Sequence, residues 1–275
     1  MKDESMSALP LSKSGREALE VATKIVKEAG GILKAHFLSE KEIRSKGKRN
    51  LVTDVDLLVE KHIVTCLRNE FPDHGILAEE SSNIVGDGGY LWILDPLDGT
   101  ANYTYKIPFF SISLALTYKE EVLLGLIYEP LREELFWAQK GKGAFLNKSP
   151  LVVPSRKISQ ATIVGFDLGY DDERTREILA LLNSFWSGEK GFRIMGSAAL
   201  GLAYVACGRL DIYLHPSVYP WDIAGGLLLI NEVGGEVIDW GWKPATIRSK
   251  KVFAFGKNNL QTAAAIMNIL KEHSE

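Results

Sequence analysis

A short apolar run that ends in two aspartates is the feature that most limits how this chain can fold. Residues 91–94 have the length and the polar borders of a buried strand, which brings Asp95 to its end. Pro96 is expected to stop the run from continuing as a central strand, and Gly99, directly after Asp98, lets the backbone turn sharply. The segment therefore predicts two carboxylates held close together on one tight turn.

Two carboxylates on one turn call for a cation between them. At 4 Å they repel by about 1 kcal/mol in water and by about 4 kcal/mol at an effective dielectric constant near 20. With oxygen ligands only and no His or Cys nearby, a hard cation such as Mg2+ is the first choice. The alternative is a solvated, Asx-rich surface turn. A covalent mechanism of the haloacid dehalogenase type is excluded, because the position of its nucleophilic aspartate, two residues before Asp98, is Pro96.

Composition sets the class of protein and excludes several partners. Of 275 residues, 46% are hydrophobic and 24% charged, which is typical of a soluble globular chain of one or two domains. A net charge of -3 does not favour binding to nucleic acid or to an anionic membrane. The first residues lack the apolar core of a signal peptide, and no apolar run approaches the roughly 18 residues of a membrane span, so we expect a cytoplasmic protein. Cys66 and Cys207 are expected to be small core thiols rather than a disulfide.

Hydrophobic periodicity predicts the order of the elements. Apolar residues recur at helical spacing over 14–38, and a second helix is expected from Thr53 or Asp54 to the residues before Pro72. The basic segment 44–50 has no periodicity and is interpreted as a mobile loop with solvated charges at Lys46, Lys48 and Arg49. The other expected elements are strands at 76–77, 91–94, 110–118, 122–128, 135–138, 161–166, 192–195, 211–214 and 252–255, and helices at 173–186, 197–207, 220–232 and near 260–271.

This alternation of helices with groups of strands predicts a mixed α/β protein built as a layered sandwich. We expect a single domain over 1–275, with approximate halves at 14–150 and 151–275. No repeat or linker interrupts it.

Acidic residues end several of the apolar segments. Glu79 and Glu80 follow a strand, Asp95 and Asp98 follow another, and Asp222 lies in the first turn of a helix. A helix start at 196–198 offers backbone N–H groups of Gly196, Ser197 and Ala198 to a phosphate or to water. Each acid also has a structural interpretation, as a cap or a surface salt bridge, and for Glu80 that interpretation has equal weight. None of the five histidines shows metal-ligand spacing, which argues against zinc, and Trp221 is expected in the core.

Three segments carry a resemblance to a known family. AEES at 78–81, WILDPLDGTANY at 92–103 and PWDIAGG at 220–226 resemble the three signatures of the inositol monophosphatase family. The resemblance runs from about residue 51 to the glycines at 234 and 235. It implies a five-layer αβαβα sandwich of the inositol monophosphatase/fructose-1,6-bisphosphatase type, a homodimer, and an Mg2+-dependent phosphomonoesterase that is sensitive to lithium.

The resemblance also implies a role for individual residues. One Mg2+ would be bound by Glu79, Asp95 and the carbonyl of Leu97. A second would be bound by Asp95, Asp98 and Asp222. A third, weaker ion is expected near Glu79. Thr100, hydrogen-bonded to Glu79, would orient the attacking water, and the N–H groups of Gly99 and Thr100 would hold phosphate oxygens. Asp56 matches the acid that follows the family's mobile loop, and Lys46 lies near the place of the loop lysine.

The choice of substrate depends on His215. Inositol-specific members carry a glutamate seven residues before the helix aspartate, where this chain has His215. A histidine that is partly cationic near neutral pH would suit a second phosphate on the substrate. Alternatively, the His215 side chain points away from the site and does not contact the substrate. We expect inositol monophosphate as the substrate, with fructose 1,6-bisphosphate or NADP and other nucleotides as alternatives. An interaction protein with vestigial activity is the alternative of another class.

Overall fold

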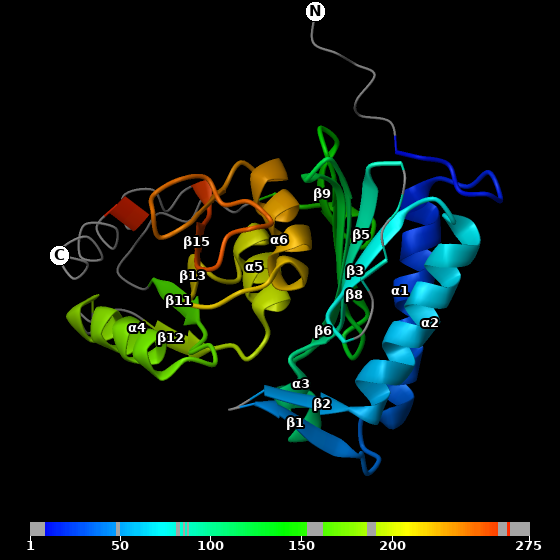
Figure 1. Cartoon of the computed structure of the whole chain (residues 1–275). Coiled ribbons are helices and arrows are strands. Elements are labelled where there is room, and N and C mark those ends of the chain that lie inside the picture. Colours follow the sequence, from blue (N-terminus) through cyan, green and yellow to red (C-terminus); the bar gives the residue numbers. More distant parts are fainter. Residues whose placement is uncertain are drawn as a thin grey trace, which may run out of the picture.

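The computed structural model describes residues 9–47, 50–80, 83–84, 86, 88–152, 162–185, 191–257 and 263–264. Figure 1 shows five layers in the order helix pair, large sheet, helix pair, small sheet and single helix. The αβαβα sandwich expected for this chain is therefore confirmed. All strands of the large sheet come before residue 151 and all strands of the small sheet come after it, which agrees with the expected boundary between halves. The single-domain organisation stays a prediction.

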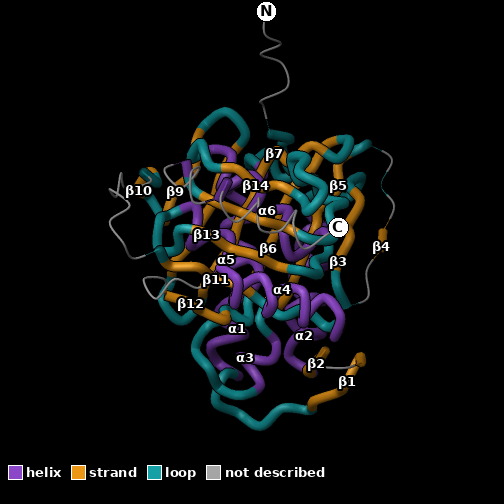
Figure 2. The backbone as a smooth tube through the Cα atoms, turned by 90° about the vertical axis from the view of Figure 1, so that its left-hand side faces the viewer, coloured by secondary structure: helices purple, strands orange, loops and turns teal. Residues whose placement is uncertain are grey.

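The helices make three of the five layers. An outer pair covers the large sheet, a middle pair lies between the two sheets, and one helix covers the small sheet (Figure 1). In Figure 2, which is turned by 90°, these layers lie one behind another. The outer pair is α1 (Ala18–His36) and α2 (Asp54–Glu70), the middle pair is α5 (Ala198–Ala206) and α6 (Pro220–Glu232), and α4 (Asp172–Phe185) is the single helix. A one-turn helix, α3 (Thr100–Thr104), follows the central turn.

The strands form two sheets and a separate hairpin. Among the described residues of the large sheet only β3 and β5 pair in parallel, whereas β12, β11 and β13 are parallel in the small sheet. The large sheet has the order β10 (Ser149–Pro150), β9 (Gly143–Leu146), β8 (Glu134–Gln139), β7 (Glu121–Glu129), β6 (Ser111–Tyr118), β5 (Tyr90–Asp98), β3 (Gly75–Ala78), β4 (Asn83–Ile84). The small sheet has the order β12 (Gly191–Ile194), β11 (Ile163–Phe166), β13 (Ile212–His215), β15 (Val252–Phe255), β14 (Glu236–Ile238).

The second helix begins where the sequence predicts. Thr53 is its N-cap, and the Thr53 hydroxyl accepts a hydrogen bond from the Val55 N–H at 3.2 Å. The Asp56 carboxylate in turn accepts the Thr53 N–H at 3.0 Å, which completes a capping box. The apolar stripe of α2 is buried against α1 and the large sheet, as expected. The cap therefore fixes both the helix and the Asp56 carboxylate.

The prediction of a loop at 44–50 is wrong for the residues of this segment that the structure describes, 44–47 and 50. Residues Ile43–Gly47 form β1, which pairs antiparallel with β2 (Asn50–Thr53). Every residue of β1 is exposed, so the strand has no apolar alternation for a sequence pattern to reveal. Lys46 pairs with two glutamates, as described below, while Lys48 and Arg49 lie outside the described residues.

The strand that carries the central aspartates is longer than predicted. β5 continues through Pro96 to Asp98, and its register with β6 shifts between Asp95 and Asp98. Pairing with β3 already ends at Leu94, so the missing N–H of the proline leaves no partner unsatisfied on that side. Pro96 therefore shifts the register instead of ending the strand.

Several short elements carried too little sequence signal to be predicted, namely α3, β4, β9, β10 and β14. Most of the helix expected near 260–271 lies outside the described residues. Cys66 and Cys207 are both free thiols, and each is only half-buried rather than a core residue. Within the described residues, no helix has the length and apolarity to cross a membrane.

Two adjacent glycines in α1 predict opposite responses to alanine. A Cβ at Gly31 would meet nothing within 4 Å, whereas one at Gly30 would lie 2.4 Å from Cε1 of Tyr128. Gly31→Ala is expected to stabilise the helix by up to about 1 kcal/mol. Gly30→Ala has the same favourable effect on helix propensity, but it overpacks the contact with β7, which is expected to destabilise the fold by about 1–3 kcal/mol. Thermal unfolding should show a higher melting temperature for Gly31→Ala and a lower one for Gly30→Ala, and equal shifts would contradict this packing.

Candidate active site

One cavity of about 220 Å³ collects the acidic side chains that end separate apolar segments. Glu79 follows β3, β5 carries Asp95 and Asp98, and α6 brings Asp222 in its first turn. The cavity is also lined by other residues predicted from the sequence, namely Leu97, Gly99, Thr100, Gly196, Ser197, Ala198 and His215. Asp56 and Lys46 are not in the lining but contact Thr100 and Glu79, which are. The structure thus brings the predicted residues together around one cavity.

The turn after Asp95 is held by its own backbone. Asp95 Oδ1 accepts the Leu97 N–H at 2.9 Å, which fixes the carboxylate against the chain. Gly99 has a φ of 94°, in the left-handed region, and a Cβ there would lie 3.0 Å from the Gly196 carbonyl oxygen. Only glycine fits this position, as the sequence predicts, and the turn can then start α3 at Thr100.

Burial raises the pKa of three carboxyl groups in this cavity, and neighbouring carboxylate charges add to the effect at Asp95 and Asp222. Asp95 is 2% exposed, and burial, followed by the charges of Glu79, Asp98 and Asp222, raises its pKa well above the usual range. Burial is also the largest cause for Asp222, whose pKa lies well above its usual range, and for Asp98, whose pKa rises to about 6. The cavity therefore favours the binding of protons or cations, as the repulsion argument predicts.

Asp98 caps the middle helix α5. Its carboxylate accepts the Ala198 N–H at 2.9 Å and the Ala199 N–H at 3.1 Å, and also the hydroxyl groups of Ser111 and Ser197. The Gly196 N–H donates to Asp167 Oδ1 at 2.6 Å. These N–H groups are satisfied by protein carboxylates, so the prediction that Gly196 and Ala198 offer them to phosphate is wrong in this structure. A helix N-terminus attracts any carboxylate, including one from its own chain.

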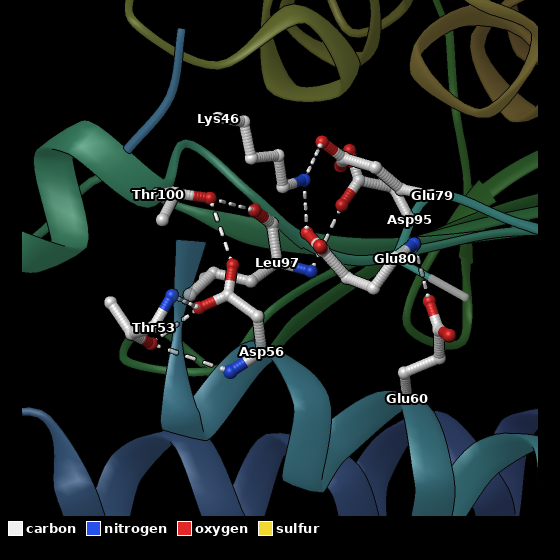
Figure 3. Close-up of polar contacts among 9 residues, drawn as sticks. All are labelled: Lys46, Thr53, Asp56, Glu60, Glu79, Glu80, Asp95, Leu97 and Thr100. Carbon is white, nitrogen blue, oxygen red and sulfur yellow. Dashed lines mark hydrogen bonds and ion pairs between the residues drawn. The ribbon is translucent and has the colours of Figure 1, made fainter. Parts of the chain in front are cut away.

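Figure 3 shows the ammonium group of Lys46 between two glutamates. Its Nζ lies 2.9 Å from Glu79 Oε1 and 2.6 Å from Glu80 Oε1. Glu80 also donates its backbone N–H to Glu60 Oε2 at 2.8 Å, and burial raises the pKa of its carboxyl to about 7. Lys46 is therefore not a solvated charge, and the contacts of Glu80 are those of the structural alternative.

Thr100 contacts a different carboxylate from the one expected. Its hydroxyl lies 3.0 Å from Asp56 Oδ1 and 3.0 Å from the Leu97 carbonyl oxygen, and it is positioned to donate to either (Figure 3). Among the described residues, Glu79 makes no hydrogen bond to Thr100, so this detail of the resemblance is wrong here. Asp56 is held from its other side by the N–H and hydroxyl of Thr53, and burial raises the pKa of Asp56 to about 6. Asp56 and Thr100 therefore form one hydrogen-bonded unit beside the cavity.

His215 is buried and neutral. It is 8% exposed, and burial lowers its pKa to about 3, so the expectation of a partly cationic side chain is wrong. Its Nδ1 accepts the Ser217 N–H at 3.1 Å. The neutral ring therefore carries its proton on Nε2 and offers one hydrogen-bond donor.

Sequence reasoning missed part of the cavity wall. Asp167, Tyr170 and Tyr219 line it together with Trp221, which is half-buried and stacks on Tyr219 at 5.1 Å between ring centroids. Trp221 thus packs against the core, as expected, and also faces the cavity. Asp167 carried a usable signal, because it directly follows the apolar strand β11, just as Glu79 follows β3.

Asp167 predicts a pH-dependent stability. It accepts the Tyr213 hydroxyl at 2.6 Å, yet burial raises its pKa from 3.8 to about 7. Between these values the folded state binds more protons than the unfolded state, so the free energy of unfolding falls as pH rises, by up to about 1.4 kcal/mol per pH unit. Asp167→Asn removes this term. Denaturant unfolding in EDTA should show the variant gaining stability relative to wild type from about pH 4 to pH 7, and a constant difference would contradict it.

Comparisons with known proteins match nearly the whole chain. A model of the inositol monophosphatase family matches residues 15–274. An inositol monophosphatase of Dictyostelium discoideum is 38% identical over 251 residues, which are 87% of this chain and 91% of that protein. The crystal structure of extragenic suppressor protein suhB from Bartonella henselae aligns with a TM-score of 0.85 at 32% identity, over 92% of this chain and 98% of that one. An IMPase/NADP phosphatase complexed with Mg2+ and phosphate aligns with a TM-score of 0.76 at 25% identity, over 90% and 94%.

The layered fold, the acidic cavity and these matches define a phosphomonoesterase. The chain belongs to the inositol monophosphatase family.

Proposed function

We propose that this phosphomonoesterase uses Mg2+ to hydrolyse a small phosphorylated metabolite, with inositol monophosphate as its main substrate. The charge of the cavity carries the proposal. The described residues that line it include no lysine or arginine, but they include five acids: Glu79, Asp95, Asp98, Asp167 and Asp222. A phosphate dianion is repelled from such a wall unless cations neutralise it.

The donor atoms suit hard cations. We propose that Glu79, Asp95 and the Leu97 carbonyl hold one Mg2+, and that Asp95, Asp98 and Asp222 hold a second. In the described part of the chain, the hydrogen bonds to Asp95 and Asp222 use one oxygen of each carboxylate, and Asp98 Oδ1 accepts only the Ala198 N–H. Each of these groups thus retains lone pairs, and oxygen-only ligands favour Mg2+. A third, weaker ion would compete with Lys46 for Glu79.

The reaction needs a positioned water and a proton acceptor. When bound, Mg2+ would neutralise the phosphate and make a water more acidic. Thr100 would accept a hydrogen bond from that water while donating its own to Asp56 Oδ1, 3.0 Å away. Asp56, fixed by the capping box, would take up the proton, and the Gly99 and Thr100 N–H groups would hold phosphate oxygens. Glu79, which also lines the cavity, would complete the orientation of the water.

His215 supports a polyol phosphate as the substrate. A neutral imidazole with its proton on Nε2 suits a hydroxyl oxygen of an inositol ring, and it adds no charge for a second phosphate. This weakens the argument for fructose 1,6-bisphosphate. The inositol monophosphatase of Dictyostelium discoideum supports the inositol substrate by its name, and the IMPase/NADP phosphatase structure supports Mg2+ and keeps NADP as an alternative.

Phosphate release by the purified chain, with and without Mg2+, tests the proposal. The panel is inositol 1-phosphate, fructose 1,6-bisphosphate, NADP, histidinol phosphate and 3'-phosphoadenosine 5'-phosphate. We expect Mg2+-dependent release with the highest kcat/KM on inositol 1-phosphate and inhibition by millimolar Li+. If another compound of the panel gave the highest kcat/KM, that compound would replace inositol monophosphate as the proposed substrate. If no compound released phosphate in a Mg2+-dependent way, a binding protein with vestigial activity would be favoured.

We further propose a cytoplasmic homodimer. The family resemblance is the support for the dimer, and light scattering on the purified chain is its test. A monomer at micromolar concentration would contradict it.

A further inference from the structure

Three side chains of different chemistry converge on the outer helix pair, and none of them lines the acidic cavity. Glu28 extends from α1, while His62 and Cys66 lie four residues apart on one face of α2. One carboxylate oxygen, one imidazole nitrogen and the sulfur all lie within 4.8 Å of one another. The spacing of His62 and Cys66 is one that metal-binding helices use, so the prediction that no histidine has such spacing is wrong.

The distances between these atoms are wider than good hydrogen bonds. His62 Nε2 lies 3.6 Å from Glu28 Oε2, beyond the range of a hydrogen bond, and 4.0 Å from Cys66 Sγ, at the outer limit for sulfur. Tetrahedral zinc, with bonds of about 2.0–2.1 Å to nitrogen or oxygen and about 2.3 Å to sulfur, sets neighbouring ligand atoms about 3.4–3.6 Å apart. The same imidazole nitrogen faces both partners, so a small closure of one exposed and two partly exposed side chains brings the three atoms to metal distance.

We propose that Glu28, His62 and Cys66 bind one zinc ion. Thiolate, imidazole and carboxylate are the ligands zinc takes, whereas Mg2+ prefers the oxygen-only cavity. Binding places zinc on the thiolate and releases the thiol proton to solvent, and water fills the fourth position. With one thiolate and one carboxylate, the occupied site is electrically neutral.

The neighbouring lysine does not block the site. Lys24 Nζ lies 3.7 Å from Glu28 Oε1, whereas His62 faces Oε2, so the carboxylate can keep both partners. The Lys24 and Glu28 side chains are 61% and 44% exposed, and an exposed pair of this kind is weak. His62 is 30% exposed, which leaves a path for the ion from solvent.

Zinc at this site would join α1 to α2 without entering the catalytic cavity. α2 carries Asp56 at its first turn, and six residues of helical rise put His62 about 9 Å further along the axis. The bound ion should therefore raise the melting temperature by fastening the outer helix pair, while the rate of phosphate release at saturating Mg2+ stays unchanged.

Cobalt titration of the reduced, full-length chain tests the site by a signal that the cavity cannot produce. In excess Mg2+, Co2+ should give a thiolate-to-cobalt charge-transfer band that saturates at one equivalent and disappears when Zn2+ is added. Cys66→Ser should abolish the band, and His62→Gln should weaken Co2+ binding at least tenfold. Cys207→Ser, the matched control at the chain's other cysteine, should keep it.

No band in the wild-type chain, or a band that persists in Cys66→Ser, would overturn the proposal. Because Cys66→Ser and His62→Gln change partly exposed side chains outside the catalytic cavity, both should keep wild-type phosphate release at saturating Mg2+. That control shows that the variants are folded.

Discussion

Asp95→Asn is expected to lower kcat/KM for phosphate release at least about a thousandfold, the largest effect on activity that this site predicts. Asp95 is the carboxylate that both proposed Mg2+ positions share, so its loss weakens both at once. The asparagine keeps the shape of the side chain and can still accept the Leu97 N–H. The loss of activity would therefore report the missing charge rather than a changed fold.

The same substitution should stabilise the metal-free protein. Burial and the charges of Glu79, Asp98 and Asp222 raise the pKa of Asp95, which means that its ionised form is unfavourable in the folded state. In EDTA at neutral pH, thermal unfolding of Asp95→Asn should occur at a higher temperature than that of the wild type. Added Mg2+ should raise the melting temperature of the wild type much more than that of the variant.

Asp239→Asn provides the matched control. Asp239 accepts N–H groups of Gly241 and Lys243 in a turn that does not line the cavity. Its asparagine variant should keep wild-type kcat/KM and the full response to Mg2+. Unchanged turnover in Asp95→Asn would mean that the proposed cavity is not the catalytic site.

Local pattern was sufficient to predict most of the frame that holds these acids. The apolar run before Asp95, the helical stripe of α2 and the turn glycine at Gly99 each have a short-range physical cause. Glu79, Asp95, Asp98 and Asp222 reached the cavity because strand ends and helix starts meet at the same edge of a layered sheet. Asp167, which follows the same rule, was overlooked.

What the pattern could not supply was the partner of each polar group. Nothing local states that Asp98 would cap α5, or that Thr100 would bond to Asp56 rather than Glu79. The protonation of His215 depends on burial in the finished fold. Strand β1 is exposed along its whole length, so its pairing with β2 rather than a hydrophobic pattern defines it. These features arise from contacts between residues that are distant in the sequence. The hydrophobic periodicity of the sequence carries no information about such contacts.

The spacing between layers also depends on contacts distant in sequence, and one of them positions Asp222. Gly125 on β7 packs against Gly225 of α6, and a Cβ on Gly125 would lie 2.8 Å from the Gly225 carbonyl oxygen and 2.9 Å from its Cα. Both obstacles are backbone atoms, so α6 itself must move to make room. Gly225 lies one helical turn after Asp222, and the Ser113 hydroxyl bonds to the Trp221 carbonyl at 3.0 Å beside it. A shift of α6 at this contact therefore displaces Asp222.

Gly125→Ala is accordingly expected to impair both stability and catalysis. Overpacking of this kind destabilises by about 1–3 kcal/mol, which for a chain of this size lowers the melting temperature by several degrees. A displacement of Asp222 of about 1 Å should lower kcat roughly a hundredfold. Gly191→Ala is the control, because a Cβ on that strand glycine meets only an Arg193 guanidinium nitrogen at 3.6 Å. Thermal unfolding and phosphate release, measured on both variants, separate the outcomes: if Gly125→Ala behaves like Gly191→Ala, the two glycines do not set the distance between the large sheet and α6.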